Sequence, residues 1–356
     1  MSDSLLLVVY GFELPDLEQV AELLEDLDLL VPGYIPPTAG LYLPESFLID
    51  QIEEGLEFYI APDRNLASRM MQIATGRPHA DDHRAAALLM AFAQALDLHF
   101  EPSIAFHELA YKQGNEAALQ ELAGFRAADK ENKQVWLDLA LGRQPTLSFP
   151  KPQAVSFMDL AKPLKRWRRN YIAMLEIGYL ELQTLTPLER IIRLIAWMEH
   201  EFFIAGPALL FAAHYFSPRF PKKRMLKQLR SSKRENALEG AANAAWDVTY
   251  VSDFVERVNS ANGSNKRYLF ATQDTALRAV STALLEFAIN DHSESELTQL
   301  LAQWWPAKDA PPIAAAITRL MSLAGRDRSA DEQRANNFVD KLIAAGETKL
   351  SLPLSS

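Results

Sequence analysis

The hydrophobic and polar positions along the chain follow two periods, one typical of β-strands and one typical of α-helices. Apolar runs predict strands at 5–10 (LLLVVY), 57–61 (EFYIA), 98–103 (LHFEPS) and 266–274 (KRYLFATQD), and a last strand in TKLSLPL at 348–354. Between these runs, apolar positions recur with the helical period of about 3.6 residues. Strands that alternate with helices predict an α/β fold with a central, mainly parallel sheet.

The predicted helices fill most of the remaining chain. They cover 15–30, a short stretch after the loop VPGYIPPTAG, 64–75, 82–96, 103–113, much of 115–150, several long segments of 157–240, then 246–260 and 275–346. The most apolar stretch, FFIAGPALLFAAHYF at 202–216, has 15 residues and is too short to span a bilayer. It is therefore predicted to be a buried helix, and no membrane partner is expected.

Composition narrows the chemistry of the protein. The 356 residues include no cysteine, which excludes disulfides, thiolate nucleophiles and cysteine-bound metals and is compatible with a reducing, cytoplasmic location. The N-terminus has no basic region before its apolar run, so no signal peptide is predicted. P-loop, Rossmann and GxSxG fingerprints are missing as well. Any metal must be bound by oxygen or imidazole ligands.

The net charge of −10 is distributed unevenly along the sequence. Residues 162–234 hold 15 Lys/Arg and 5 Glu, a net charge of +10, whereas the rest of the chain holds 21 basic and 41 acidic residues. This segment includes KRWRR at 165–169 and PKKRMLKQLRSSKR at 221–234. Such a segment is typical of a polyanion-binding surface, although a basic face that docks on the protein's own acidic surface or on a partner has the same composition.

Four acidic residues stand out by their local setting. Asp63 and Asp274 each follow an apolar strand, and ligands of parallel sheets bind outside the carboxyl ends of the strands. Glu108 lies on a predicted helix, and Asp247 lies near a predicted helix start, where the helix dipole favours a carboxylate. Clustered carboxylates repel one another unless a cation lies between them, which makes such a cluster a candidate metal site.

The order of these residues resembles that of the PIN-like nucleases. The matching motifs are a strand ending in Asp-x-Asn (Asp63 to Asn65), a helix bearing Glu (AFHELA), a helix opening with Asp (AAWDVTYVSDF) and a strand ending in Thr-x-Asp (FATQD). The resemblance implies a PIN-like three-layer α/β/α fold in which Asp63, Glu108, Asp247 and Asp274 bind one or two Mg²⁺ or Mn²⁺ ions. It further implies that Asn65 and Thr272 orient these carboxylates and that a metal-bound water hydrolyses phosphodiester bonds, with RNA as the expected substrate.

The resemblance divides the chain into five segments. These are an N-terminal strand–helix extension (1–55), the first part of the PIN-like core (56–114), a helical insertion that contains the basic segment (115–240), the second part of the core (241–285) and a C-terminal helical region (286–356). The insertion departs from a compact PIN domain, since 138 residues separate Glu108 from Asp247. Asp129 or Asp138 therefore remains an alternative third acid.

Nucleic acid is the expected partner, and a regulatory protein or a second copy of the chain is compatible with the sequence. The predicted phosphate-binding residues are basic residues of the insertion: Lys165, Arg166, Arg168, Arg169, Lys222, Lys223 and Arg224. Trp167, between two pairs of basic residues, could stack on a base or belong to the core. His79 and His83 have a spacing that can bind a metal on a helix, but they lack the glutamate of the HExxH motif.

Two other interpretations stay open. The chain could be a non-catalytic interaction protein on a degenerate PIN-like fold, with the basic segment docking a protein or a nucleic acid. Alternatively, the four acids could be unrelated helix caps in a helical scaffold, because an aspartate at the end of a strand is usually a turn or cap residue.

Overall fold

The computed structural model describes residues 14–36, 40–76, 81–144, 151–152, 155–220, 225–289, 293–323 and 337–353. Within these ranges the protein is a helix-rich α/β protein with 15 helices and one four-stranded mixed sheet. The predicted α/β class is therefore confirmed. The predicted first strand at 5–10 lies outside the described residues.

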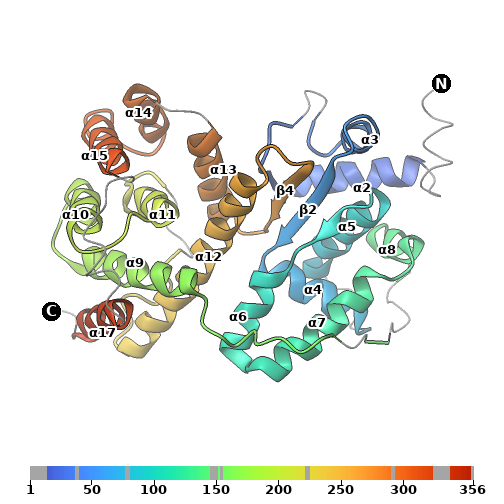
Figure 1. The fold of residues 1–356 in the computed structure, drawn as a ribbon, viewed down its shortest axis with the longest axis horizontal. Coiled ribbons are helices and arrows are strands. Elements are labelled where there is room, and N and C mark those ends of the chain that lie inside the picture. Colours follow the sequence, from blue (N-terminus) through green and yellow to red (C-terminus); the bar gives the residue numbers. More distant parts are fainter. Residues whose placement is uncertain are drawn as a thin grey trace. The chain divides into compact units, whose positions relative to one another are not determined.

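The chain forms two compact units (Figure 1). Residues 1–163 and 253–278 make up the first, which contains the whole sheet and is called the sheet unit; residues 164–252 and 279–356 make up the second, called the helical unit. The predicted helical insertion at 115–240 thus has residues in both units. The described part of the chain has no helix that is long and apolar enough to cross a membrane.

The sheet has the strand order β1-β4-β2-β3. Strands β2 (Glu57–Pro62) and β4 (Lys266–Ala271) lie side by side and parallel at its centre, and β3 (His99–Phe100) extends it in parallel beyond β2. All three were predicted. The fourth strand, β1 (Leu30–Pro32), pairs antiparallel with β4 and was missed, because the sequence pattern continued a helix to residue 30 and then indicated a loop.

Buried and partly exposed side chains alternate along β2, and the buried ones pack against helices on one face of the sheet. Phe58 and Ile60 are fully buried, whereas Tyr59 is only partly covered. The ring of Phe58 contacts Phe47 of α3 (Pro44–Glu53), which in turn contacts Phe92 of α5 (Asp81–Ala95). One face of the sheet therefore carries an aromatic core that fixes β2 and its carboxyl end.

Six further helices of the sheet unit pack around the sheet. They are α2 (Leu14–Leu27), α4 (Arg64–Ala74), α6 (Ser103–Gln113), α7 (Asn115–Asp129), α8 (Lys133–Ala140) and the last residues of α12 (Arg234–Ser260). The predicted helices at 64–75, 82–96, 103–113 and 115–150 agree with α4 to α8. Phe254 of α12 packs on Phe270 of β4, with ring centroids 5.8 Å apart.

The helical unit has no strand in its described residues. It consists of α9 (Lys165–Leu182), α10 (Pro187–His200), α11 (Gly206–Phe216), most of α12, part of α13 (Thr275–Ile289), α14 (Glu294–Ala302), α15 (Ala310–Ser322) and α17 (Phe338–Ser351). The predicted buried helix within 202–216 is confirmed, since α11 is buried from Ala208 to Phe216. The strand predicted at 348–354 is wrong, because α17 continues to Ser351 and buries Leu350.

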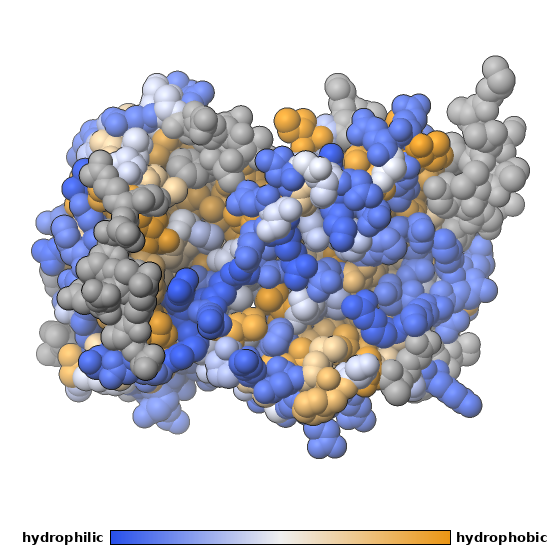
Figure 2. Space-filling view, viewed as in Figure 1, coloured by the Kyte–Doolittle hydropathy of each residue, from blue (hydrophilic) through white to orange (hydrophobic). Residues whose placement is uncertain are grey.

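The apolar surface that remains is scattered. Figure 2 shows small hydrophobic patches within a mostly hydrophilic surface. Among the described residues, the most exposed large apolar side chains are Phe157 and Ile35, at 83% and 82%. Isolated apolar side chains of this kind are normal on a protein surface.

Candidate functional site

Asp63 lies where β2 ends and α4 begins. Its side chain is the N-cap of α4, with Oδ1 accepting a hydrogen bond of 2.8 Å from the backbone N–H of Leu66. Unlike an ordinary N-cap, this carboxylate is buried, with 4% of its surface exposed. Burial of a carboxylate is costly, so a structural cap alone does not explain why Asp63 occupies this position.

Thr272 joins the ends of the two central strands. The register of β2 and β4 places Pro62 opposite Ala271, so Asp63 and Thr272 are the next pair. The Thr272 hydroxyl donates a 2.7 Å hydrogen bond to Asp63 Oδ2 and accepts one of 3.0 Å from the backbone N–H of Asp274. Thr272 therefore holds the Asp63 carboxylate and anchors the backbone of Asp274 through one hydroxyl group.

Glu108 is the second buried acid beside Asp63. It lies on α6, is 7% exposed, and accepts a 2.7 Å ion-pair contact from Lys112 one helical turn later. Burial, and to a smaller extent the nearby negative charge of Glu108, raise the pKa of Asp63 to about 6, although the hydrogen bonds from Leu66 and Thr272 act in the opposite direction. The two carboxylates thus repel one another in a desolvated setting.

Asp274 lies just after β4, the strand next to β2, and its side chain caps a helix. Its Oδ1 accepts hydrogen bonds from the backbone N–H groups of Ala276 and Leu277, at 2.9 and 3.1 Å, at the start of α13. The side chain is half-buried. Asp274 is thus tied to Asp63 through Thr272, while one of its carboxylate oxygens caps a helix.

The setting predicted for Asp247 is wrong. Helix α12 begins at Arg234, so Asp247 lies in its interior and not near a helix start. The stretch RENALEGAANAA before it is rich in helix-forming residues and continues the helix in spite of Gly240. Asp247 belongs to the helical unit, whereas Asp63, Glu108 and Asp274 belong to the sheet unit.

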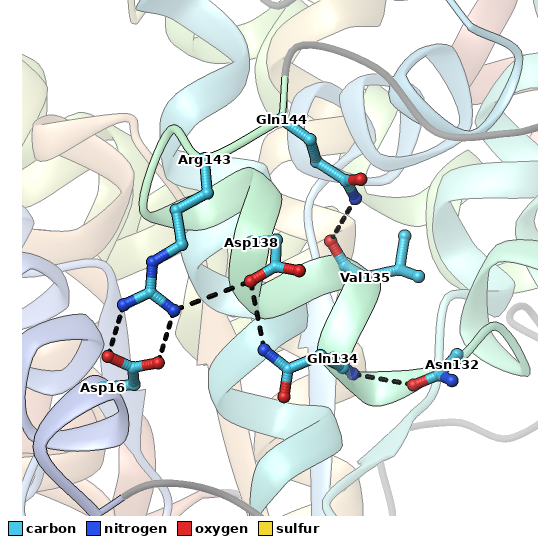
Figure 3. Close-up of polar contacts among 7 residues, drawn as sticks. All are labelled: Asp16, Asn132, Gln134, Val135, Asp138, Arg143 and Gln144. Atoms are coloured by element: carbon cyan, nitrogen blue, oxygen red, sulfur yellow. Dashed lines mark hydrogen bonds and ion pairs between the residues drawn. The ribbon is translucent and has the colours of Figure 1, made fainter.

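The two alternative acids have other partners in the sheet unit. Asp129 contacts Gln94 and Arg126, and burial raises its pKa. Asp138 lies in the polar network of Figure 3, where Arg143 bridges it to Asp16 of α2, with an Arg143–Asp16 contact of 2.5 Å. This network connects α2 with the end of α8, so both acids have clear roles in packing.

The predicted orienting and phosphate-binding residues have varied environments. Asn65 is exposed on the first turn of α4. In the helical unit, Lys165 is exposed, Arg168 pairs with Asp340 of α17, and the guanidinium of Arg169 lies 4.5 Å from the ring centroid of Phe203. Arg166 is half-buried, whereas Lys222, Lys223 and Arg224 lie outside the described residues. Two of these arginines therefore contact the protein's own helical unit.

The candidate aromatic residue and the described candidate histidine both contact other side chains of the protein. Trp167 is 6% exposed and stacks on Tyr171, with ring centroids 5.1 Å apart, so it belongs to the core. His83 Nε2 lies 2.9 Å from Gln72 Oε1. His79 lies outside the described residues.

Three cationic residues beside the acids were not predicted as functional. Lys112 pairs with Glu108, and Arg64 pairs with Glu121 of α7 at 2.6 Å. The charge of Arg69 offsets a small part of the rise in the pKa of Asp63 that burial causes. The i, i+4 spacing of Glu108 and Lys112 was readable from the sequence, but such pairs usually lie on a solvated helix face. The burial of Glu108 distinguishes this pair from an ion pair on a solvated helix face.

The donor set of Asp63 and Glu108 fits a hard divalent cation. Carboxylate oxygens are the ligands that Mg²⁺ and Mn²⁺ prefer. A cation would offset the burial, and also the negative charge of Glu108, which together raise the pKa of Asp63. The described residues contain no group of three or more acids and histidines that could hold a metal ion. Mg²⁺ commonly binds through one or two carboxylates and keeps several waters, so two carboxylates are a ligand set of the type that Mg²⁺ uses.

Comparison of the chain with protein-family models, with curated proteins and with solved structures gave no match.

Proposed function

We propose that the sheet unit is a metal-dependent nuclease with a PIN-like three-layer core, which hydrolyses phosphodiester bonds in RNA. The observation that carries the proposal is the pair of buried carboxylates, Asp63 and Glu108, at the carboxyl end of β2, with Asp274 tied to Asp63 through Thr272. Such a site suits phosphodiester hydrolysis because its carboxylates can hold the divalent ion that neutralises the charge developing on the phosphate.

Each residue of the site has a stated role in this proposal. Asp63 and Glu108 would hold Mg²⁺ or Mn²⁺, which would supply an activated water. Thr272 fixes the orientation of Asp63 through its hydroxyl, because a buried side chain with this hydrogen bond has little freedom to rotate. Asp274 keeps the end of β4 in place and adds negative charge at the edge of the site.

A cleavage assay with matched variants tests the proposal. Asp63→Asn and Asp274→Asn keep the size and the capping oxygen of the side chain, so folding should be preserved. We expect Asp63→Asn to reduce Mn²⁺-dependent cleavage of RNA by about a hundredfold or more, and Asp274→Asn to reduce it less. Asp138→Asn, an acid of the same unit that contacts Arg143, is the control and should cleave like wild type. Unchanged cleavage by both Asp63→Asn and Asp274→Asn would refute the assignment.

A non-catalytic interaction protein on the same fold is the second candidate. It is favoured by the contacts that the candidate acids already make within the protein: Glu108 pairs with Lys112, and Asp63 and Asp274 cap α4 and α13. In that case wild-type protein would cleave neither RNA nor DNA with any divalent ion. Cleavage that disappears with EDTA and with Asp63→Asn would exclude this candidate as the full explanation.

A further inference from the structure

The sheet unit itself has cationic side chains beside the candidate carboxylates: Arg69, whose charge acts on Asp63, and Arg64 and Lys112. Arg64 directly follows Asp63 on α4, and Lys112 follows Glu108 by one turn on α6. The sequence predicts that basic residues at 165–169 and 222–224 bind phosphate. Of these, Arg168 and Arg169 contact other residues of the helical unit. Arg64 and Lys112 are therefore the first residues to consider for contact with a substrate phosphate at this site.

Arg64 and Lys112 differ in how firmly their own structure holds them. The side chain of Arg64 is 18% exposed, that of its partner Glu121 is 15% exposed, and the paired atoms are buried. The side chain of Lys112 is 43% exposed, whereas its partner Glu108 is 9% exposed. The Lys112 ammonium thus lies at the boundary with solvent, and its flexible four-carbon stem allows it to leave Glu108 at small cost.

We propose that Lys112 contacts the phosphate of the substrate beside Asp63 and Glu108, and that Glu108 holds its ammonium in the resting protein. The proposal rests on the nuclease function proposed above. Glu108 exchanges the ammonium for the divalent cation, and the released Lys112 then pairs with the phosphate. One carboxylate thereby couples cation binding to the availability of a phosphate-binding group.

If this exchange occurs, removal of the Lys112 ammonium should strengthen cation binding and weaken catalysis. Lys112 competes with the cation for Glu108. An ion pair with one partly exposed and one buried partner is worth about 0.4–1 kcal/mol, so removal of the ammonium should tighten cation binding about two- to fivefold. Loss of a charged contact to the phosphate should at the same time slow cleavage about tenfold or more. A purely structural ion pair would produce neither effect.

The chain offers a closely matched control in its helical unit. Lys349 Nζ lies 3.0 Å from Glu176 Oε2, and the two side chains are 40% and 9% exposed, almost the same as for Lys112 and Glu108. Lys112→Met and Lys349→Met therefore remove equivalent lysine–glutamate pairs, one at the candidate site and one elsewhere. Lys112→Arg keeps the positive charge and should retain part of the cleavage activity.

The experiment titrates Mn²⁺ into each full-length variant by calorimetry and measures kcat/KM for RNA cleavage. We expect Lys112→Met to bind Mn²⁺ about two- to fivefold more tightly and to cleave about tenfold or more slowly, with Lys349→Met like wild type in both measurements. Tighter Mn²⁺ binding with unchanged cleavage would overturn the phosphate contact. Wild-type values in both measurements for Lys112→Met, while Asp63→Asn has lost cleavage, would overturn the role of Lys112 alone. Wild-type protein that neither binds Mn²⁺ nor cleaves RNA would overturn the proposed function and this inference together.

Discussion

The buried carboxylate of Asp63 should lower the stability of the fold at neutral pH. Its folded pKa is raised to about 6 from a usual value of 3.8, mainly by burial. A raised pKa means that the folded state binds the proton more tightly than the unfolded state, so stability is fully present below pH 3.8 and is lost as the pH rises through 6. A shift of about two units corresponds to about 3 kcal/mol, reached above pH 7.

Asp63→Asn should therefore stabilise the metal-free protein. Asparagine is neutral and has the same size. Its Oδ1 can accept the hydrogen bond from the Leu66 N–H, and its Nδ2 can donate to the Thr272 hydroxyl, which then accepts instead of donating. We expect the free energy of unfolding at pH 7.5 to rise by about 2–3 kcal/mol and the gain to shrink toward pH 4. Urea unfolding in EDTA at several pH values measures both quantities.

Asp16→Asn provides a control of opposite sign. The hydrogen bond from Arg143 lowers the pKa of Asp16, so its contribution to stability is present above its usual pKa and is lost as the pH falls. This variant should be less stable than wild type at pH 7.5, with a difference that shrinks in acid. If Asp63→Asn were likewise less stable than wild type at pH 7.5, the account of Asp63 as a strained, buried charge would be refuted.

Two further substitutions test local packing, one at the candidate site and one within the helical unit. Thr272→Val should destabilise the fold by about 2–3 kcal/mol at pH 7.5 in urea unfolding, because it leaves the buried Asp63 Oδ2 without its donor and the N–H of Asp274 without its acceptor; an unchanged midpoint would contradict the linking role of Thr272. Gly240→Ala should destabilise by about 2 kcal/mol despite the better helix propensity of alanine, because its Cβ would lie 1.9 Å from the carbonyl oxygen of Lys227. Gly124→Ala, which meets only the flexible side chain of Met71 at 3.3 Å, is the matched control and should be neutral or stabilising.

The sequence was sufficient to predict the elements whose stability is local. Strands β2 and β4 consist of alternating or apolar residues that end at a polar residue, and α4 and α6 each begin within three residues of the end of a strand. Strand β1 was missed because its three residues, which end in Pro32, have no local pattern and are held by pairing with β4. The strand predicted at 348–354 is a helix because Leu350 packs in the core of the helical unit.

The sequence pattern pointed to the acidic residues of the candidate site, but it did not point to the lysine that pairs with one of them. Asp63 and Glu108 could be found because each stands in a recognisable local setting, and burial then separates them from ordinary caps. Asp247 could not be placed, since its position depends on where α12 begins and on how the chain divides into units. Lys112 was overlooked because a spacing of four residues on a helix does not reveal that one partner is buried.

The central claim, that Asp63 and Glu108 form a cation site, is tested most directly by the effect of Mn²⁺ on unfolding. A ligand that binds only the folded state stabilises it, by about 2.7 kcal/mol at a hundred times its Kd. We predict that Mn²⁺ raises the urea midpoint of wild-type protein at pH 7.5 and leaves those of Asp63→Asn and Glu108→Gln unchanged. A midpoint that does not respond to Mn²⁺ in wild type, or that rises equally in all three proteins, would contradict the claim.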